Sequence, residues 1–320
     1  MTGGDSCASA DIISDTRFGV TGTGRDDKNM CGALDHGALI CRIMTSISVL
    51  ILTLNEEINL AECIDSCSWC DDIVVFDSFS TDRTREIADS KSVRFLQRQF
   101  DNYAAQRNAA LAQVPYRHPW VLMVDADERT PMDLVREMTA AVAMADSDTA
   151  LFRMRRKDYF LGRWLRRSSG YPSWFGRLVR LGHVRVERAV NEDYITNGKI
   201  VHLESHLHHH PFNKGIAYWY ERHNRYSNME ALAKIDACSS PLYLAALFRG
   251  DPVDRRRAMK QLVYRLPMRP SIWFLYLYIF RMGFLDGAAG LAFSRMRASY
   301  ETMIDVKMLE FKRRHRGEPV

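Results

Sequence analysis

The feature that most constrains the fold of this chain is a regular alternation of two kinds of segment between residues 47 and 154. Short, almost wholly apolar runs predict strands, and these are ISVLILT, DIVVFD, VRFLQ, WVLMVD and ALFRM. Between them lie segments of helical periodicity at residues 56–66, 84–90, 103–112 and 132–144. Strands that are apolar on both faces belong to mostly parallel sheets covered by helices, so the chain is predicted to be an α/β protein with a Rossmann-like, mostly parallel central sheet.

The pattern changes twice along the chain and thereby suggests three parts. Residues 1–43 are rich in Gly, Ser, Thr and Asp and show no periodicity, so we expect a flexible N-terminal extension. Residues 44–240 are predicted to form the main domain, although their pattern becomes irregular after about residue 150. Residues 241–320 are predicted to form a basic, amphipathic helical extension.

The net charge of +5 belongs to the C-terminal end: residues 249–320 hold 15 Lys and Arg against 7 Asp and Glu, and the rest of the chain holds 29 against 32. These basic residues lie beside two apolar runs, SIWFLYLYIF and GFLDGAAGLAF, a pairing that favours an anionic membrane surface over a nucleic-acid partner. Neither run predicts a spanning helix, because joining them would place Arg281 and Asp286 in the middle of the bilayer.

Seven scattered cysteines and no signal peptide at the start predict free thiols in a reducing cytosolic compartment. The stretch ECIDSCSWCDD has the C-x3-C-x2-C spacing with which radical enzymes hold an iron–sulfur cluster. Cys63 and Cys67, however, fall four residues apart on one face of a predicted helix, and Cys70 lies in the following turn. We therefore interpret the three as small apolar side chains that pack on the sheet.

Three polar motifs follow predicted strands: TLNEE at residues 53–57, DSFSTDRT at residues 77–84 and DADE at residues 125–128. Ligands of open parallel sheets bind beyond the carboxyl ends of the strands, so these motifs predict a site at one edge. Asp125 and Asp127 are two residues apart and could hold Mg²⁺ or Mn²⁺ through oxygen. Such an ion could neutralise the diphosphate leaving group of a sugar nucleotide.

Over residues 45–310 the chain resembles the family 2 glycosyltransferases of the GT-A fold, and among them the lipopolysaccharide core beta-1,4-glucosyltransferases. The resemblance rests on the segments SVLILTLNEEINL, DIVVFDSFSTDRTREIA, QRNAAL, WVLMVDADERTP, YFLGRWLRRSSGYP, RLVRLG, NRYSNMEA and RPSIWFLYLYIFRMGFLDG. It implies that residues 44–240 are a GT-A catalytic domain. It further implies transfer of a hexose, glucose first of all, from a UDP-sugar to a lipopolysaccharide core or other lipid-linked saccharide, with inversion, in cell-envelope or exopolysaccharide biosynthesis.

The resemblance also implies roles for individual residues. Those that would line the nucleotide-sugar pocket are Thr53, Glu56, Asp77, Arg107, Asn108 and Asp125. Asp127 would be the principal ligand of Mg²⁺ or Mn²⁺, with Asp125 touching ribose or metal. Two alternatives stay open, namely that Asp77 with Ser80 caps the following helix and that Arg107 is a solvated helix residue.

A catalytic base is needed to take the proton of the acceptor hydroxyl. By resemblance Glu192 inherits this role, although Asn191 stands where the family has histidine, and Asp193 is the second candidate. Arg177 and His209 match family positions that would contact acceptor or phosphate. The run HLESHLHHHPF invites a zinc site, but its spacing is not that of a typical one, and we prefer contacts to phosphate or sugar hydroxyls.

The C-terminal helices suggest a location at the cytoplasmic face of the inner membrane. Trp273, Phe274, Tyr276 and Tyr278 would form an interfacial segment, flanked by the basic residues Arg265 and Arg269 and by those at 255–257. Packing of these aromatics into the protein's own core is the alternative, and a homo-oligomer interface is a further one. Two other functions stay open: a polyprenol-phosphate glycosyltransferase, and a non-catalytic binding protein with the same fold.

Overall fold

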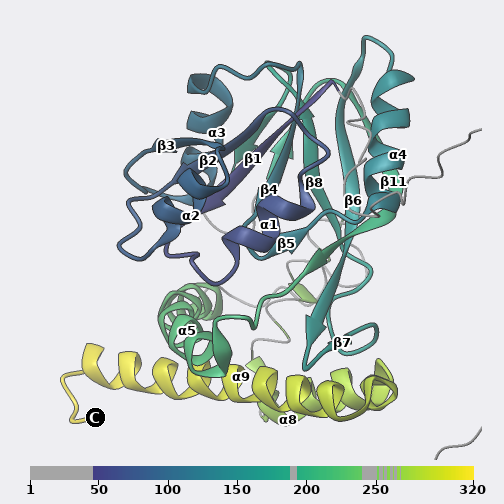
Figure 1. Cartoon of the computed structure of the whole chain (residues 1–320). Helices are drawn as coiled ribbons and strands as arrows, with labels where there is room; N and C mark the ends of the chain where they lie inside the picture. Colours follow the sequence, from purple (N-terminus) through teal and green to yellow (C-terminus); the bar gives the residue numbers. More distant parts are fainter. Residues whose placement is uncertain are drawn as a thin grey trace, which may run out of the picture. The chain divides into compact units, whose positions relative to one another are not determined.

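The computed structural model describes residues 46–187, 193–239, 251, 255, 258–259, 262, 265–266 and 268–320, and residues 41–320 form one compact unit. Its centre is a nine-stranded sheet with the order β3-β2-β1-β4-β8-β6-β11-β5, in which β7 pairs with β6 (Figure 1). The strands are β1 (Ile47–Thr53), β2 (Ile73–Asp77), β3 (Arg94–Gln97), β4 (Trp120–Asp125), β5 (Glu128–Arg129), β6 (Thr149–Phe160), β7 (Arg163–Trp164), β8 (Trp174–Arg180) and β11 (Lys199–His209).

The first half of the sheet is wholly parallel, because β1 pairs in parallel with both β2 and β4, and β2 with β3. This confirms the predicted α/β class and its strand-by-strand alternation. The second half is mixed: β8 is antiparallel to β4 and β6, whereas β11 is parallel to β6. A separate two-stranded ribbon consists of β9 (Arg185–Glu187) and β10 (Asp193–Ile195).

Helices cover both faces of the sheet, as predicted, and each face has its own core (Figure 1). One core packs α1 (Leu60–Ser66) and α4 (Met132–Ala143) against residues such as Val49 and Leu122. The other packs α3 (Tyr103–Gln113) and the β9–β10 ribbon against residues such as Leu50 and Met123. The helix α2 (Thr84–Ser90) lies between β2 and β3 in sequence. Each fully buried Leu, Ile or Val side chain stabilises the fold by about 1.5–3 kcal/mol.

The three cysteines of the C-x3-C-x2-C stretch are free thiols, and all three lie in the α1 core. Cys63 and Cys67 are fully buried, and the Cys70 thiol donates to the carbonyl of Ile47 at 3.2 Å. Burial raises the pKa of Cys70 to about 12, so this thiol stays protonated at neutral pH. The packing interpretation is confirmed, and the side chains do not converge on an open pocket.

A helical layer forms the third core (Figure 1). It contains α5 (Gly215–Ser239), α8 (Arg269–Leu275), the π-helical turn η1 (Tyr276–Phe280), the 3-10 turn η2 (Gly283–Asp286) and α9 (Gly287–His315). A buried ion cluster joins these helices: Glu301 of α9 binds Lys234 of α5 at 3.2 Å and also binds Arg269, which in turn binds Asp305 at 2.8 Å.

This ion cluster corrects the expectation that Arg269 flanks an interfacial segment, because its side chain is 4% exposed and bound to two carboxylates. Of the expected interfacial aromatics, Tyr276 is exposed, whereas Trp273, Phe274 and Tyr278 are half-buried. Within the described part of the chain, no helix by itself is long and apolar enough to cross a bilayer. The segments Arg269–Phe280 and Gly283–His315 meet that criterion only as a pair bent by 72°.

The predicted extension at 1–43, the predicted boundary at 240/241 and residues 256 and 257 lie outside the described residues. The division into three parts therefore stays a prediction.

Candidate active site

Three polar loops meet at the carboxyl ends of three neighbouring strands. In the β1/β2 pair Thr53 is the partner of Asp77, and in the β1/β4 pair Leu52 is the partner of Asp125. The motifs that the sequence placed after separate strands are thus brought to one edge of the sheet. Because ligands of open α/β sheets bind at this edge, it is the candidate active site.

Asp77 is fully buried at the centre of this edge. Its carboxylate accepts hydrogen bonds from the Thr53 hydroxyl at 2.8 Å, the Ser80 backbone N–H at 2.8 Å and the Gln97 side-chain amide at 3.1 Å. The Ser80 hydroxyl donates to it as well. Asp77 therefore fastens the loop that follows β2. It does not cap the next helix, which was the alternative for it, because α2 begins at Thr84 and its N-cap residue is Arg83. Its predicted contact to a nucleotide stays a prediction, as does that of Thr53.

The loops after β1 and β2 are hydrogen-bonded to each other. The backbone N–H of Asn55 donates to the Ser80 hydroxyl, and the backbone N–H of Thr81 donates to the Asn55 side-chain oxygen, both at 2.8 Å. Asn55 and Phe79 have positive φ angles of 55° and 62°. Asparagine adopts this conformation readily, whereas for a bulky residue it costs about 1–3 kcal/mol. Phe79, half-exposed at this edge, was not predicted as a site residue, because a positive φ leaves no mark in the sequence.

Behind the edge, two arginines hold Asp125 between them. Arg107 of α3 binds one carboxylate oxygen at 2.8 Å, and Arg177 of β8 binds the other at 2.6 Å. Arg177 also binds the fully buried Glu128 at 2.8 Å. Burial by itself would raise the pKa of Asp125, but the charges of Arg177 and Arg107 outweigh it and lower that pKa far below its usual range. Asp125 is therefore ionised, with both oxygens engaged.

This geometry shows where two of the residues predicted for the site lie. Arg107 is 3% exposed, so it is not the solvated helix residue that was the alternative for it. Arg177 is 4% exposed and faces two carboxylates. Its predicted contact to acceptor or phosphate stays a prediction.

Asp127 lies beside a buried histidine. The His209 ring nitrogen Nε2 is 3.3 Å from the Asp127 carboxylate, and Nδ1 is 2.7 Å from Asp158. Burial and Arg156 act to lower the pKa of His209, but Asp127 and Asp158 outweigh them and raise it to about 9. The ring is thus an imidazolium between two carboxylates. His209 was predicted to contact acceptor or phosphate, and the structure places it directly beside the predicted metal ligand.

Glu56 is bound by a residue that the sequence did not suggest. The Lys214 ammonium group, just before α5, lies 2.6 Å from one Glu56 oxygen, and the Asn59 side-chain amide donates to the other at 2.9 Å. Burial raises the pKa of Glu56 despite these partners. Lys214 comes from a distant part of the chain, and only the tertiary fold brings it to this edge.

Asn108 and one candidate base, Asp193, lie at the β9–β10 ribbon. The Asn108 side chain forms two hydrogen bonds to the backbone of Val186 in β9, at 2.7 and 2.9 Å. It therefore anchors the ribbon, and its contact to a nucleotide stays a prediction. Asp193 begins β10 opposite Glu187, whereas Asn191 and Glu192 lie outside the described residues.

The acidic residues of this edge fit a divalent ion only in part. Asp125 pairs with two arginines and Asp127 with one histidine, so fewer cations compete with a metal ion for Asp127, and His209 would be a neighbouring nitrogen ligand once deprotonated. In the described part of the chain, no group of three or more His, Cys, Asp or Glu side chains is arranged to hold a metal ion. Mg²⁺ is commonly held by one or two carboxylates together with substrate phosphates, and Asp127 suits such a shared site.

The other histidines of the HLESHLHHHPF run face aromatic rings. The Tyr171 hydroxyl lies 3.1 Å from His206, and the Tyr159 ring packs against both His208 and His210. Burial lowers the pKa of His206, His208 and His210. These neutral rings are available to bind hydroxyl groups.

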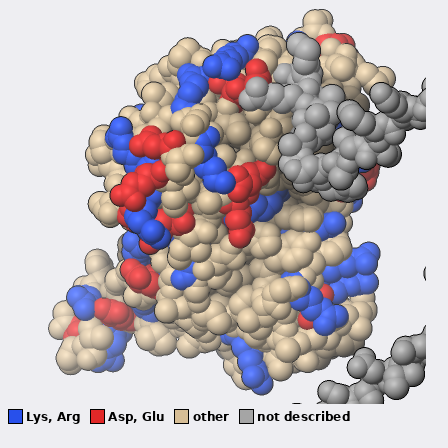
Figure 2. Space-filling model, in the orientation of Figure 1, with Lys and Arg blue, Asp and Glu red and all other residues tan. Residues whose placement is uncertain are grey.

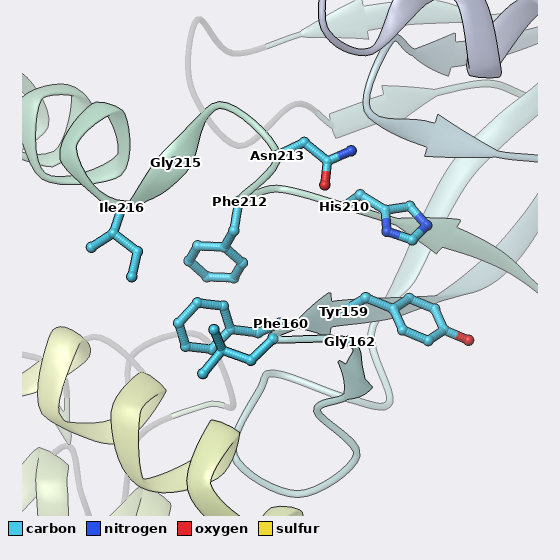
Figure 3. A pocket seen from close by; sticks show the side chains of 9 residues that line it. Tyr159, Phe160, Gly162, His210, Phe212, Asn213, Gly215 and Ile216 are labelled. Atoms are coloured by element: carbon cyan, nitrogen blue, oxygen red, sulfur yellow. The ribbon is translucent and has the colours of Figure 1, made fainter. Parts of the chain in front are cut away.

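A cavity of about 390 Å³ lies beside the candidate site (Figure 3). Figure 3 shows the Tyr159 and His210 rings one above the other and the Phe160 and Phe212 rings facing each other, with ring centroids 5.1 and 4.1 Å apart. Asn213, at the same cavity, donates to the side-chain oxygen of Asn59 at 2.9 Å. The backbone N–H of His210 donates to the carbonyl of Asp127 at 2.8 Å, so the cavity wall is continuous with the site.

Known proteins that match this chain in sequence include glycosyltransferases. Residues 48–204 match the model of the glycosyl transferase family 2. The chain is 28% identical over 270 residues to the lipopolysaccharide core biosynthesis glycosyltransferase LpsC of Rhizobium meliloti, an alignment that covers 79% of this chain and 90% of that protein. It is also 32% identical over 109 residues to an uncharacterized glycosyltransferase of Rickettsia typhi, covering 34% of this chain and 37% of that one.

Among solved structures, the chain is similar to glucosyl-3-phosphoglycerate synthase from Mycobacterium tuberculosis, solved with Mn²⁺, UDP and glucosyl-3-phosphoglycerate. The identity is 23% and the TM-score 0.31, and the match covers 36% of this chain and 45% of that one. A second structure of the same synthase, with Mg²⁺ and UDP, gives 20% identity and a TM-score of 0.32 over 43% and 57% of the two chains.

Proposed function

We propose that this chain, which is a family 2 glycosyltransferase, transfers a hexose, glucose first of all, from a UDP-sugar to a lipopolysaccharide core or other lipid-linked saccharide. The observation that carries the proposal is the convergence of Thr53, Asp77, Asp125 and Asp127 at the carboxyl ends of β1, β2 and β4. The similarity to LpsC extends along most of both chains and supports the acceptor class.

The loops after β1 and β2, which are hydrogen-bonded to each other, would receive the nucleotide. Asp77 and Asn55 hold these loops in one conformation before the donor arrives, so little ordering is needed on binding. Arg107 and Arg177 keep Asp125 ionised and fixed at the end of β4, where it would accept hydrogen bonds from ribose hydroxyls. Phe79 offers an exposed ring at the same edge.

Asp127 would hold Mg²⁺ or Mn²⁺ together with the donor's diphosphate. When bound, the ion supplies charge neutralisation of the leaving nucleoside diphosphate. The chain's own contribution is positional: Asp158 orients His209, and His209 orients the Asp127 carboxylate. Lys214 adds a positive charge at the Glu56 side of the edge.

The acceptor hydroxyl would attack the anomeric carbon from the side opposite the diphosphate, which inverts the configuration. A carboxylate must take the hydroxyl proton as the new bond forms. Glu192 and Asp193 are the two candidates, and Asp193 lies at the start of β10. The aromatic and histidine side chains of the neighbouring cavity, among them Tyr159 and His210, would bind the acceptor sugar.

A lipid-linked acceptor requires the enzyme to work at a membrane surface. We place the protein on the cytoplasmic face of the inner membrane, with an anionic lipid surface as its partner. The basic residues and exposed apolar side chains of the C-terminal helices support this location.

The test is nucleotide release from a panel of sugar nucleotides, with lipopolysaccharide-core oligosaccharides as acceptors and with Mn²⁺, Mg²⁺ or EDTA. We expect one UDP-hexose to give acceptor-dependent release that EDTA abolishes. Equal release with and without EDTA would refute the metal dependence. Release from a non-uridine donor alone would refute UDP as the nucleotide of the donor. Absence of release with every donor and acceptor would refute the proposed transfer.

A further inference from the structure

An apolar surface is exposed on the helical layer, far along the chain from the site loops. In the segment 272–285, which we call the apolar turn, most large apolar side chains face solvent, and Phe280 does so most, at 79% exposure. The others are Ile272, Leu275, Tyr276, Ile279, Met282, Phe284 and Leu285, each between 40% and 52% exposed. Exposed large apolar side chains gathered in one segment are typical of a contact with another molecule or with a membrane.

Arginines border the apolar turn. Arg166, Arg167 and Arg281 line a cavity of about 340 Å³ together with Phe280, and the other residues of its wall are Tyr171, Pro172 and Met282. None of these described lining residues is acidic. The cavity therefore combines positive charge with an apolar rim, which is complementary to a phosphate group attached to an acyl chain.

The apolar turn is fixed to the catalytic unit rather than loosely attached. The buried Asp286 accepts hydrogen bonds from the backbone N–H groups of Arg167 and Ser168, at 2.9 and 2.8 Å. The Arg281 guanidinium donates to the carbonyl of Tyr171. Gly283 packs so closely on η1 that an added Cβ would lie 2.5 Å from the carbonyl oxygen of Leu277. The surface thus exists before any partner binds, which lowers the entropic cost of docking.

We propose that the apolar turn inserts into the interfacial region of an anionic membrane while Arg166, Arg167 and Arg281 bind lipid headgroup phosphates. The purpose of this contact rests on the proposed function, because a lipid-linked acceptor must be reached at the bilayer. The contact itself can be tested without any transferase activity.

Two observations favour a membrane over a second copy of the chain. The charged residues that line the cavity beside Phe280 are all arginines, and a symmetric contact would bring like charges together. The segments Arg269–Phe280 and Gly283–His315 meet at a bend of 72° within the apolar turn, so the exposed apolar side chains lie on both arms of a corner, a shape that suits insertion into a bilayer surface. Figure 2 shows few charged side chains over the middle of the helical layer on the side drawn there, whereas acidic and basic side chains gather over the part that contains α2 and β3.

The experiment is co-sedimentation of the full chain with phosphatidylcholine vesicles that contain or lack phosphatidylglycerol. We expect the parent chain to bind the vesicles that contain phosphatidylglycerol. The variants Arg166→Gln and Arg167→Gln should each bind them with an affinity about fivefold lower. Phe280→Glu should weaken it at least about tenfold, because a charged group replaces an inserted ring. Two control variants far from the apolar turn, Arg85→Gln and Met144→Glu, should bind like the parent chain.

Three results would overturn the proposal. One is absence of vesicle binding by the parent chain, and another is equal binding by Phe280→Glu and the parent. The third is a lipid-free dimer, measured by light scattering, that Phe280→Glu converts to a monomer, because the apolar turn would then be a contact between copies. Nucleotide release with a water-soluble, deacylated core acceptor separates this proposal from the proposed function, since Phe280→Glu should leave that rate unchanged.

Discussion

Asp125, held between Arg107 and Arg177, is the residue on which the electrostatics of the site depend. Its two oxygens are each 2.6–2.8 Å from a guanidinium nitrogen of a nearly fully buried arginine. Arg177 in turn compensates Glu128, which is fully buried. A buried charge that loses its partner is far more costly than the pair is stabilising.

Replacing Arg177 should therefore destabilise the protein strongly. We expect Arg177→Gln to lower the free energy of unfolding by about 3–5 kcal/mol, because Glu128 is left buried with less compensation. Urea unfolding followed by circular dichroism measures this. The double variant Arg177→Gln/Glu128→Gln should recover part of the loss, and Arg85→Gln, on the surface of α2, should change stability by less than about 0.5 kcal/mol. A loss in the double variant equal to that in the single one would contradict this explanation.

At the residue scale, the sequence predicts which side chains lie at the ends of strands. It does not predict contacts between residues that are distant in the chain. Thr53, Asp77 and Asp125 could be placed together because parallel strands bring their carboxyl ends to one edge. The contact of Lys214 with Glu56 depends on where α5 begins, and the contact of His209 with Asp127 depends on the register of β11. Neither the start of α5 nor the register of β11 can be predicted from local periodicity.

At the scale of elements, a buried carboxylate joins the strands at the opposite end of the sheet from the site. Asp72, just before β2, accepts hydrogen bonds from the Ser48 hydroxyl at 2.6 Å, the Arg117 backbone N–H at 2.8 Å and the Arg94 guanidinium at 2.7 Å. Burial by itself would raise the pKa of Asp72, but these partners together lower it. Asp72 is thus a stabilising contact whose strength depends on pH.

The stabilisation by Asp72 should be lost in acid. Since its pKa is lower in the folded than in the unfolded chain, the contribution is present above the unfolded value of about 4 and disappears as the pH falls through the folded value. We expect Asp72→Asn to be less stable than the parent at pH 7 and to lose less stability between pH 5 and pH 3. Urea unfolding at several pH values measures both; parallel pH curves for the two proteins would rule this role out.

At the scale of elements, the apolar turn requires a glycine at position 283. We expect Gly283→Ala to destabilise the protein by about 1–3 kcal/mol, because the new methyl group meets the carbonyl of Leu277, a backbone atom that cannot move aside easily. Thermal unfolding checks this. Gly170→Ala is the matched control, since its methyl group would meet only a side-chain atom, the Ser173 hydroxyl, at 3.3 Å. Equal melting temperatures for the two variants would show that the turn accommodates the methyl group.

The predicted helices and strands agree with the structure where the segments are apolar. They differ where tertiary contacts override the local helix or strand propensity. The expected helix at 56–66 begins only at Leu60. The backbone N–H groups of Glu56 and Glu57 instead donate to the hydroxyl of Thr84, at the start of α2, and to the carboxylate of Asp82 in the loop before it. After residue 150 the strands β6, β8 and β11 mix parallel and antiparallel pairs and carry many charged residues, so their periodicity is weak.

At the scale of the whole molecule, the sheet edge and the helical layer are joined. Lys214, which leads into α5, contacts Glu56, and the Tyr226 hydroxyl of α5 lies 3.2 Å from that of Tyr103 in α3. The layer that carries the apolar turn therefore also borders the candidate site. In the proposed function, this arrangement would let the helical layer dock on the membrane while the adjoining site faces an acceptor anchored there.

The most direct measurement is calorimetric binding of UDP to the parent chain and to Asp127→Asn, each with Mn²⁺ and with EDTA, using Asp89→Asn on α2 as the control. We predict that Mn²⁺ tightens UDP binding to the parent and to the control by about 10–100-fold and leaves Asp127→Asn almost unaffected, because in the proposed function Asp127 would hold the ion together with the diphosphate. Equal tightening in Asp127→Asn, or no UDP binding to the parent chain, would contradict a nucleotide-sugar site at this edge of the sheet.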